Sequence, residues 1–356
     1  MKEASEMIKP YEIMGIQSNI RQVFRDKKGP PRIEAIEENL EHALSLLEGR
    51  LSPEWSVSPK LVVFPEFFLQ GYTPGRSIQD WIDIGIRIPG KESQILGKKA
   101  KELNCYIAAN VWEFDEEWPG RYWDTTFIVD PSGEVILRYK KHCARLGYAF
   151  PNDVLDEFVR RHGDEALFPV VDTPIGKLGC FICYDCHFPE VARCLAMNGA
   201  EILIHCDGNP RGNLAYTQAK DRAIRSRAWE NKVYIITVKR GHWLDGDLPY
   251  DEGEGQTAII DYQGQDLSVA RTSGECTIKA EIDVERLRYA RSQTRHNFLP
   301  MVQSEIYARY YKRASLYPAN VWQDKPAKSL KELQEVTQKQ WDKMYERGIF
   351  VKPGGC

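Results

Sequence analysis

The chain has 356 residues and a mass of 41.0 kDa, which exceeds an average domain of about 100 to 200 residues but suits one large α/β domain. Hydrophobic residues make up 42% of the sequence and charged residues 28%, a composition that excludes a mainly disordered or fibrous protein. Forty-eight basic and 51 acidic side chains leave a net charge of −3, so no overall positive field exists to hold nucleic acid or an acidic membrane surface.

The sequence lacks the features of membrane and exported proteins. Its N-terminal segment, MKEASEMIKPYEIMGIQSN, has no apolar signal core, and no apolar stretch approaches the ~20 residues that cross a bilayer. The nine cysteines are an odd set in a chain long enough to bury a core without crosslinks. We therefore predict a cytoplasmic protein with free thiols.

The first half of the chain predicts strands that alternate with helices. Residues 11–19 are typical of a strand, and residues 31–49 carry apolar side chains at helical spacing behind two prolines. The run LVVF at 61–64 predicts a short buried parallel strand that delivers Glu66 to its C-terminal edge. After a helix near 92–103, antiparallel strands are predicted in CYIAANVWEF, YWDTTFIVD and VILRYKK, which ends at Lys141.

The second half repeats this order after a long polar loop at 142–166, in which we predict a short helix around 153–161. Two strands are predicted in VVDTPIGKLGCFICYD, a helix in FPEVARCLAMNG, a strand in EILIHC, a helix over 213–230 and a strand in KVYIITV. GQTAIIDYQGQ and ECTIKAEID complete the sheets. The pattern predicts an αββα sandwich, in which helices cover the outer faces of two mixed β-sheets.

From about Leu287 the sequence becomes basic and aromatic, and it ends in a helical stretch rich in lysine and glutamine. We therefore predict a main domain over 1–286 and a C-terminal arm over 287–356 that packs on this domain or on a neighbouring subunit. Aromatic residues of the arm favour a dimer or larger homo-oligomer, with packing inside one chain as the alternative; they are Tyr307, Tyr310, Tyr311, Tyr317 and Trp322.

Cys183 is the first candidate for chemistry. It ends the strand GCFIC and precedes a helix whose first turn contains Pro189 and Glu190. Backbone N–H groups and the positive end of a helix lower the pKa of a thiol at such a junction, which favours the nucleophilic thiolate. A cysteine among apolar strand residues is also typical of a small buried hydrophobe, and we interpret Cys180 and Cys194 in that way.

Cys180, Cys183 and Cys186 also form a C-x-x-C-x-x-C pattern, a spacing that could bind zinc or an iron-sulfur cluster. Strand alternation places Cys180 and Cys183 on opposite faces, and no second pair completes four ligands. A metal site is therefore only an alternative interpretation.

A carboxylate and a lysine accompany this cysteine. Glu66 lies between apolar residues at a strand end, where partial desolvation raises its pKa toward that of a general base. Lys141 ends a hairpin beside Lys140, and taken alone it is more typical of a solvated lysine. No histidine is placed to activate the thiol, since His142 and His187 are only chain neighbours of the candidates.

Together these segments resemble the nitrilase superfamily of carbon-nitrogen hydrolases, in particular its amidase-like branch, whose hallmark is a Glu-Lys-Cys triad in that chain order. VVFPEFFLQGY resembles the glutamate segment, LRYKKH the lysine segment and GKLGCFICYDCHFPEVAR the cysteine segment. In the lysine segment the residue two places after the tyrosine is catalytic, so the role passes to Lys141 rather than Lys140. The resemblance covers roughly residues 11–285 and agrees with the αββα sandwich.

Two features depart from the family pattern. The family often has asparagine before threonine in its middle strand, where this chain has Asp124, so a supporting hydrogen bond is expected to differ. Many members also carry a second glutamate in the loop after the lysine. By its distance before Gly163, we assign this role to Glu157, with Asp156 and Glu165 as alternatives.

The resemblance implies a mechanism that needs no metal or organic cofactor. Glu66 would accept the proton of Cys183 as the thiolate attacks an amide carbonyl, and Lys141 and the backbone N–H of Tyr184 would stabilise the oxyanion. Ammonia or an amine would leave a thioester, which water activated by the same carboxylate would hydrolyse. Glu157 would orient the substrate or this water.

Tyr184-Asp185 after the cysteine resembles the amidase branches, since nitrilases tend to have Trp-Glu and carbamoyl-D-amino-acid hydrolases Asn-Asp. The resemblance thus implies hydrolysis of a small amide to an acid and ammonia, with a nitrilase or N-carbamoyl hydrolase as the alternative. An alternative of another class is a non-catalytic thiol protein that senses redox state or binds metal. Residues beside the motifs are candidates for a substrate pocket, although Phe67 and Trp112 also suit a core: Phe67, Tyr72, Trp112, Tyr184 and Asn209.

Overall fold

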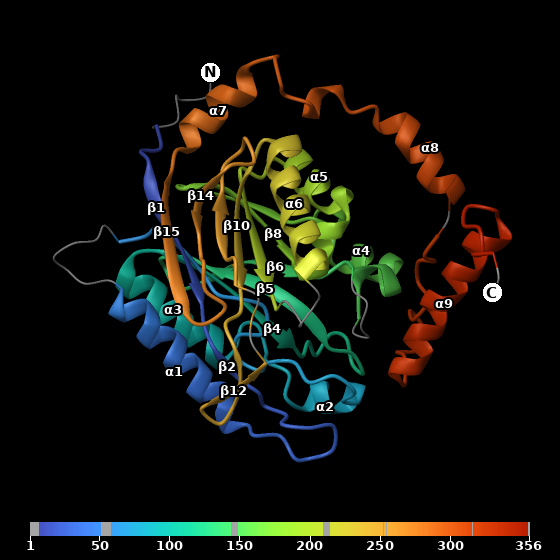
Figure 1. The fold of residues 1–356 in the computed structure, drawn as a ribbon, viewed down its shortest axis with the longest axis horizontal. Helices are drawn as coiled ribbons and strands as arrows, with labels where there is room; N and C mark the ends of the chain where they lie inside the picture. Colours follow the sequence, from blue (N-terminus) through green and yellow to red (C-terminus); the bar gives the residue numbers. More distant parts are fainter. Residues whose placement is uncertain are drawn as a thin grey trace.

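Two six-stranded sheets form the centre of the protein (Figure 1). The computed structural model describes residues 7–50, 58–143, 149–208, 214–251, 253, 255–314 and 316–354. The first sheet has the order β15-β1-β3-β4-β5-β6 and contains β1 (Tyr11–Gln17), β3 (Leu61–Val63), β4 (Tyr106–Glu113), β5 (Trp123–Val129), β6 (Val135–Lys140) and β15 (Cys276–Ile282). The second has the order β14-β13-β10-β9-β8-β7 and contains β7 (Val170–Thr173), β8 (Gly176–Ile182), β9 (Ile202–Asp207), β10 (Tyr234–Lys239), β13 (Ala258–Ile260) and β14 (Asp266–Val269).

The inner strands of each sheet run parallel and the outer ones antiparallel. β1, β3 and β4 are parallel in the first sheet, and β8, β9 and β10 are parallel in the second. Because parallel strands end at the same edge of their sheet, the residues that follow β3, β8 and β9 gather at the carboxyl edges. This placement brings together segments that are far apart in the sequence.

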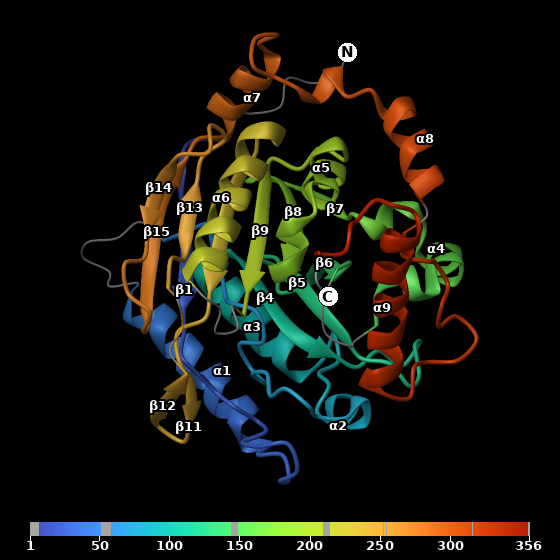
Figure 2. The ribbon, with the colours of Figure 1, turned by 45° about the vertical axis from the view of Figure 1, so that its right-hand side comes forward.

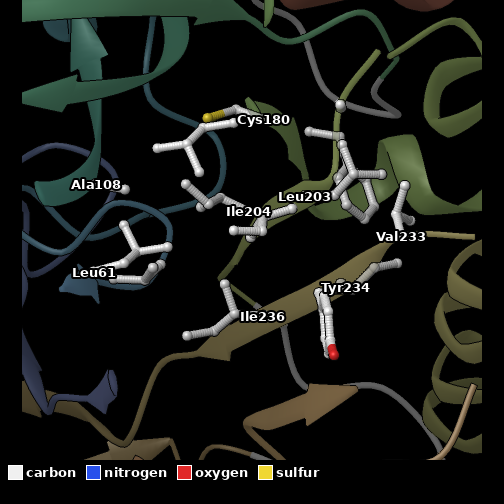
Figure 3. Packing of buried hydrophobic residues seen from close by; sticks show 14 of the residues in the cluster. Leu61, Ala108, Cys180, Leu203, Ile204, Val233, Tyr234 and Ile236 are labelled. Atoms are coloured by element: carbon white, nitrogen blue, oxygen red, sulfur yellow. The ribbon is translucent and has the colours of Figure 1, made fainter. Parts of the chain in front are cut away.

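Apolar side chains fill the space between the two sheets. Figure 3 shows Leu61 and Ala108 of the first sheet on the side to which Ile204 and Ile236 of the second sheet point, and all four belong to one buried cluster. In β9, Leu203 points to the other face, where Val233 lies, because successive strand residues alternate between faces. Burial on both faces explains why these strands are continuous apolar runs.

Helices cover both outer faces (Figure 1). Apolar residues of α1 and α3 belong to a second buried cluster with the first sheet, whereas α5 and α6 pack on the second sheet. The predicted αββα sandwich is therefore confirmed. The helices of the described residues are α1 (Glu34–Gly49), α2 (Ile78–Asp83), α3 (Lys91–Leu103), α4 (Leu155–His162), α5 (Pro189–Met197), α6 (Leu214–Asn231), α7 (Val284–Ser292), α8 (Ser304–Ala314) and α9 (Leu330–Glu346). In this described part of the chain, no helix has both the length and the hydropathy to cross a membrane.

A small third sheet was not predicted. It has the order β12-β11-β2 and contains β2 (Ile20–Arg21), β11 (Trp243–Asp245) and β12 (Leu248–Asp251). Strands of two to four residues are too short to show a repeating pattern of apolar side chains, and only the tertiary fold brings β2 beside β11. The short helix α2 was missed for the same reason.

The C-terminal arm arcs around the domain (Figures 1 and 2). The predicted boundary at residue 287 falls inside α7, whose Val284 and Leu287 are buried in the core cluster. Beyond α7 the arm returns to its own domain, where the N–H of Asn320 donates to the carbonyl of Asn152 at 2.8 Å and that of Trp322 to the carbonyl of Asp153 at 3.0 Å. These contacts lie just before α4, next to which α9 stands in Figure 2. Assembly into a homo-oligomer stays a prediction.

Candidate active site

The three residues of the predicted triad meet between the two sheets. Glu66 follows β3, Lys141 directly follows β6, and Cys183 directly follows β8. The Lys141 ammonium lies 2.6 Å from a carboxylate oxygen of Glu66. A Glu66 oxygen, the sulfur of Cys183 and an oxygen of Asp207 all lie within 4.8 Å of one another. The structure thus brings a thiol, a carboxylate and an ammonium group into one site.

The charges of this cluster are removed from solvent. Glu66 is 1% exposed and Lys141 2%, and Asp124 on β5 supplies a second carboxylate 2.8 Å from the Lys141 ammonium. Burial raises the pKa of Glu66 well above its usual value, Lys141 opposes this rise, and Asp124 adds to it. A carboxylate with a raised pKa is a stronger base, which suits it to take the thiol proton.

Backbone and amide groups hold Glu66 in place. The N–H of Gly208 donates to the second carboxylate oxygen of Glu66. The side chain of Asn110 on β4 accepts from the N–H of Phe67 at 2.9 Å and donates to Asp124 at 2.8 Å. This network fixes Phe67, whose φ is 58°, although such backbone angles are uncommon outside glycine. Asn110 therefore links the segment that contains Glu66 to Asp124 and fixes the two carboxylates relative to each other.

Cys183 begins a tight turn between β8 and α5. Its φ is 41° and it is 9% exposed. Asp185 holds this turn by accepting from the N–H of Ile182 at 3.0 Å, the N–H of Cys143 at 2.8 Å and the hydroxyl of Tyr139 at 2.7 Å. Tyr139 lies on β6, and Lys141 and Cys143 follow this strand, so these bonds tie the cysteine turn to the segment that contains Lys141. Contrary to the lowered pKa expected from the sequence, burial, and next the Glu66 charge, raise the pKa of the Cys183 thiol well above its usual value.

A second lysine reaches the cysteine from the other side, and the sequence analysis missed it. Lys220 on α6 lies 3.8 Å from the sulfur of Cys183 and 2.6 Å from each carboxylate oxygen of Asp207, at the end of β9. The signal was the position of Lys220 on its helix, since Thr217, Lys220, Ile224 and Ala228 form a buried stripe. A lysine in such a stripe needs a buried partner.

Histidine contacts the backbone of the cysteine rather than its sulfur. The Nε2 atom of His205 lies 3.1 Å from the carbonyl oxygen of Cys183, and its Nδ1 atom lies 2.8 Å from the hydroxyl of Thr237. Burial lowers the pKa of His205 to about 3, so the ring is neutral at physiological pH. His205 therefore supports the cysteine turn.

The contacts described for Glu157 are on its own helix rather than with this cluster, so the structure does not support its assignment to the site. Its carboxylate pairs with Arg160 and Arg161 on its own helix, α4, each at 2.6 Å. The two arginines, through hydrogen bonds and charge, lower the pKa of Glu157 to about 2. Asp156 and Glu165, the alternatives, are exposed. Distance along the chain misled the assignment, because burial of Phe158 decides which face of α4 points inward.

Four of the five predicted pocket residues lie in the described part of the chain, and Asn209 lies outside it. Phe67 borders the site, with its ring centre 5.8 Å from the Lys141 ammonium. Tyr72 is half-buried, and burial raises its pKa to about 12, with Lys141 and Glu66 near enough to modify that rise. Tyr184 is half-buried beside His187, at 4.8 Å between ring centres.

Trp112 is a core residue, which the sequence analysis gave as the alternative to a place in the substrate pocket. Its side chain is fully buried and stacks on Phe67 at 4.1 Å, and its indole N–H donates to the carbonyl of Gly71 at 2.9 Å. It therefore supports Phe67 from behind.

The charges of the site argue against a metal ion. Glu66, Cys183 and Asp207 could each offer one ligand atom. However, the ammonium groups of Lys141 and Lys220 lie 2.6 Å from these carboxylates and already supply the positive charge. Cys180 is buried in the core between the sheets, so the C-x-x-C-x-x-C spacing does not reflect one ligand set.

The chain is similar to known proteins in sequence and in fold. Formamidases of Bacillus cereus and Bacillus thuringiensis are 33% identical over 206 residues, which are 57% of this chain and 56% of theirs. The match thus spans little more than half the length of these curated relatives.

Solved structures share the fold at low identity. A carbon-nitrogen hydrolase from Helicobacter pylori G27 superposes with a TM-score of 0.65 at 21% identity, over 86% of this chain and 99% of that one. A Saccharomyces cerevisiae member of the nitrilase superfamily gives 0.60 at 23% identity, over 82% and 98%, and an amidase from Nesterenkonia sp. gives 0.60 at 18% identity, over 86% and 100%. The family model for carbon-nitrogen hydrolases matches residues 27–292. The chain therefore belongs to the carbon-nitrogen hydrolase family.

Proposed function

We propose that the protein is a cysteine-dependent amidase, which hydrolyses the carbon-nitrogen bond of a small amide to an acid and ammonia. One observation carries this proposal: a buried thiol, a buried carboxylate and a buried ammonium group meet in one site, with Glu66 bonded to Lys141 at 2.6 Å and within 4.8 Å of the sulfur of Cys183. A nucleophile beside a base that a third group orients is the usual arrangement for covalent catalysis.

In the first half of the reaction, Glu66 takes the proton of Cys183 while the sulfur attacks the amide carbonyl. The oxygen of the tetrahedral intermediate carries the negative charge, which the Lys141 ammonium and the backbone N–H of Tyr184 stabilise. The carbon-nitrogen bond then breaks, and Glu66 returns its proton to the leaving nitrogen. The products of this half are ammonia and a thioester on Cys183.

In the second half, water replaces ammonia. Glu66 takes a proton from the water as its oxygen attacks the thioester carbonyl, and the same donors hold the new oxyanion. The carbon-sulfur bond breaks, the acid leaves, and the proton returns to the thiolate. Every proton transfer in this scheme uses one carboxylate, which is consistent with the fixed orientation of Glu66.

The formamidase relatives favour a very small acyl group. The side chains around the sulfur also favour it, because they are charged and closely spaced. An acyl group with a long apolar chain would have to displace these polar groups or leave them unpaired. We therefore propose formamide and short aliphatic amides as the substrate class.

The test is to offer the purified protein formamide, acetamide, the matching nitriles and an N-carbamoyl amino acid, and to assay ammonia. The proposal predicts ammonia from the amides, and loss of turnover in C183S and E66Q while circular dichroism shows an intact fold. Turnover of the nitrile alone would identify a nitrilase, and CO2 release with the carbamoyl compound would identify a carbamoyl hydrolase. A reversible disulfide without any turnover would favour the non-catalytic thiol protein.

A further inference from the structure

Two pairs of lysine and carboxylate flank the sulfur of Cys183. On one side, Lys141 lies 2.6 Å from Glu66. On the other side, Lys220 lies 2.6 Å from both oxygens of Asp207 and 3.8 Å from the sulfur itself. Lys220 is 1% exposed and Asp207 is fully buried. The proposed mechanism above uses only the first pair.

Transfer of the thiol proton changes where the negative charge lies. Before the transfer the charge is on Glu66, next to Lys141, and after it the charge is on the sulfur. Lys141 then keeps a carboxylate partner, since Asp124 lies 2.8 Å from its ammonium. The new anion is the sulfur, which Lys220 faces at 3.8 Å. An ammonium group at this distance from a buried thiolate stabilises it strongly, because solvent screens such charges little.

We propose that Lys220 is a second catalytic lysine, which binds the Cys183 thiolate once Glu66 has taken the proton, and that Asp207 holds its ammonium in place. The effect of Lys220 on turnover rests on the proposed amidase function, whereas the effect of Lys220 on the reactivity of the Cys183 thiol does not. No covalent bond to Lys220 forms. The proton moves from sulfur to the Glu66 carboxylate and returns by the same route, while Lys220 stays charged throughout.

The surrounding charges are consistent with this role. Among the residues that the structure describes, the charged or titratable groups around Cys183 are Glu66 after β3, Lys141 after β6, Asp185 and Cys186 in its own turn, His205 and Asp207 on β9, and Tyr216 and Lys220 on α6. Among those that act on the thiol, Glu66 and Asp207 raise its pKa, and Lys220 and Lys141 lower it. Burial alone would lower the pKa of Lys220, but Asp207 raises it well above the usual value, so Lys220 remains an ammonium.

A neighbouring pair provides a matched control. Lys239 on β10 lies 2.6 Å from Asp221, the residue next to Lys220 on α6, and Lys239 is fully buried. This pair has the same chemistry and nearly the same burial. The hydrogen bond between Lys239 and Asp221 joins β10 to α6. Lys220, in contrast, contacts the sulfur of Cys183 in addition to its carboxylate partner. Removal of the two pairs therefore separates loss of a buried ion pair from loss of the contact with sulfur.

The experiment compares the double variants D207N/K220M and D221N/K239M, which each remove a pair without leaving a buried charge unpaired. Each is treated with iodoacetamide over a range of pH, and alkylation of the Cys183 peptide is followed by mass spectrometry. The alkylation midpoint is the pH at which the rate of alkylation is half of its maximum. We expect the alkylation midpoint of D207N/K220M to rise by less than about one pH unit, because the loss of Asp207 offsets part of the effect of losing Lys220, with that of D221N/K239M close to wild type. An unshifted midpoint in a folded D207N/K220M variant would overturn the proposal.

A second pair of variants leaves Asp207 in place and covers a folding failure of the first. Arginine in K220R keeps the positive charge and glutamine in K220Q removes it, so the midpoint should rise in K220Q and not in K220R. Equal midpoints in these two variants would also contradict the proposal. Because alkylation needs no substrate, a shifted midpoint in a protein that hydrolyses no amide would keep the inference about Lys220 and refute the amidase function instead.

Discussion

The ammonium group of Lys141 lies 2.8 Å from a carboxylate oxygen of Asp124, and the N–H of Lys141 donates to the carbonyl of Asp124 at 3.0 Å. This aspartate takes the place of the asparagine that the family often has. It gives the lysine a second anionic partner beside Glu66. Lys141 is therefore held between two carboxylates. When Glu66 accepts a proton, Asp124 remains as the anionic partner of Lys141.

We predict that D124N lowers kcat by at least about tenfold, since a hydrogen bond to a charged group contributes about 1.5 to 3 kcal/mol. Asp124 raises the pKa of Glu66, so its loss makes Glu66 a weaker base. The acidic limb of the pH-rate profile should therefore move to lower pH, because Glu66 stays deprotonated further into acid. A profile of kcat/KM against pH measures this, and a D124N limb that coincided with wild type would refute the coupling.

Gly208 is predicted to tolerate no side chain. A Cβ at this position would lie 2.6 Å from a carboxylate oxygen of Glu66 and 2.9 Å from a ring carbon of Phe67. We expect G208A to cost about 1 to 3 kcal/mol of unfolding free energy and to lower kcat more than tenfold, because Glu66 has to move. G49A is the control, since a Cβ there meets nothing within 4 Å. Equal activity of both variants would contradict the close approach of Gly208 to Glu66.

Glu157 is predicted to be dispensable for turnover. Its partners, Arg160 and Arg161, are on its own helix, and this pairing involves none of the triad residues. We expect E157Q to keep kcat within about twofold of wild type, with little change in melting temperature, as is usual for surface ion pairs. The comparison is with E66Q under the same assay. A fall in kcat for E157Q as large as that for E66Q would return Glu157 to the site.

Asp153 is predicted to make the protein less stable as the pH rises. It is 1% exposed, and its carbonyl accepts from the arm at Trp322. Burial raises the pKa of its carboxyl from 3.8 to about 7 in the folded protein. Between these two values the folded state binds the proton more tightly than the unfolded state, so stability falls through this window as the pH rises and is level above it.

D153N removes this titration and keeps the shape of the side chain. We expect it to be more stable than wild type at pH 8, by about 1 kcal/mol or more, and to lose the decline between pH 4 and 7. Urea unfolding at several pH values measures both effects. Parallel stability curves for the two proteins would mean that Asp153 is ionised in the folded state.

Much of the architecture followed from local patterns. The apolar runs at 61–64, 176–182 and 202–207 are buried on both faces, which is typical of strands inside a sandwich. Glu66 and Cys183 were each predicted at a strand end, but they follow strands of different sheets, β3 and β8, so only the family resemblance implied that they meet. The family resemblance then selected Lys141 over Lys140, and the structure indeed directs Lys140 to Glu113 and Asp115 instead.

What the sequence by itself determined is the class of fold, the family and three polar residues at strand ends, because strand periodicity and motif order are local properties of the chain. Only the tertiary structure decided how α6 and α4 are turned toward the sheets. The rotation of α6 brings Lys220 to Asp207 and to the sulfur of Cys183, and that of α4 turns Glu157 toward its own arginines. Both orientations depend on packing between distant elements, which no short stretch of sequence records.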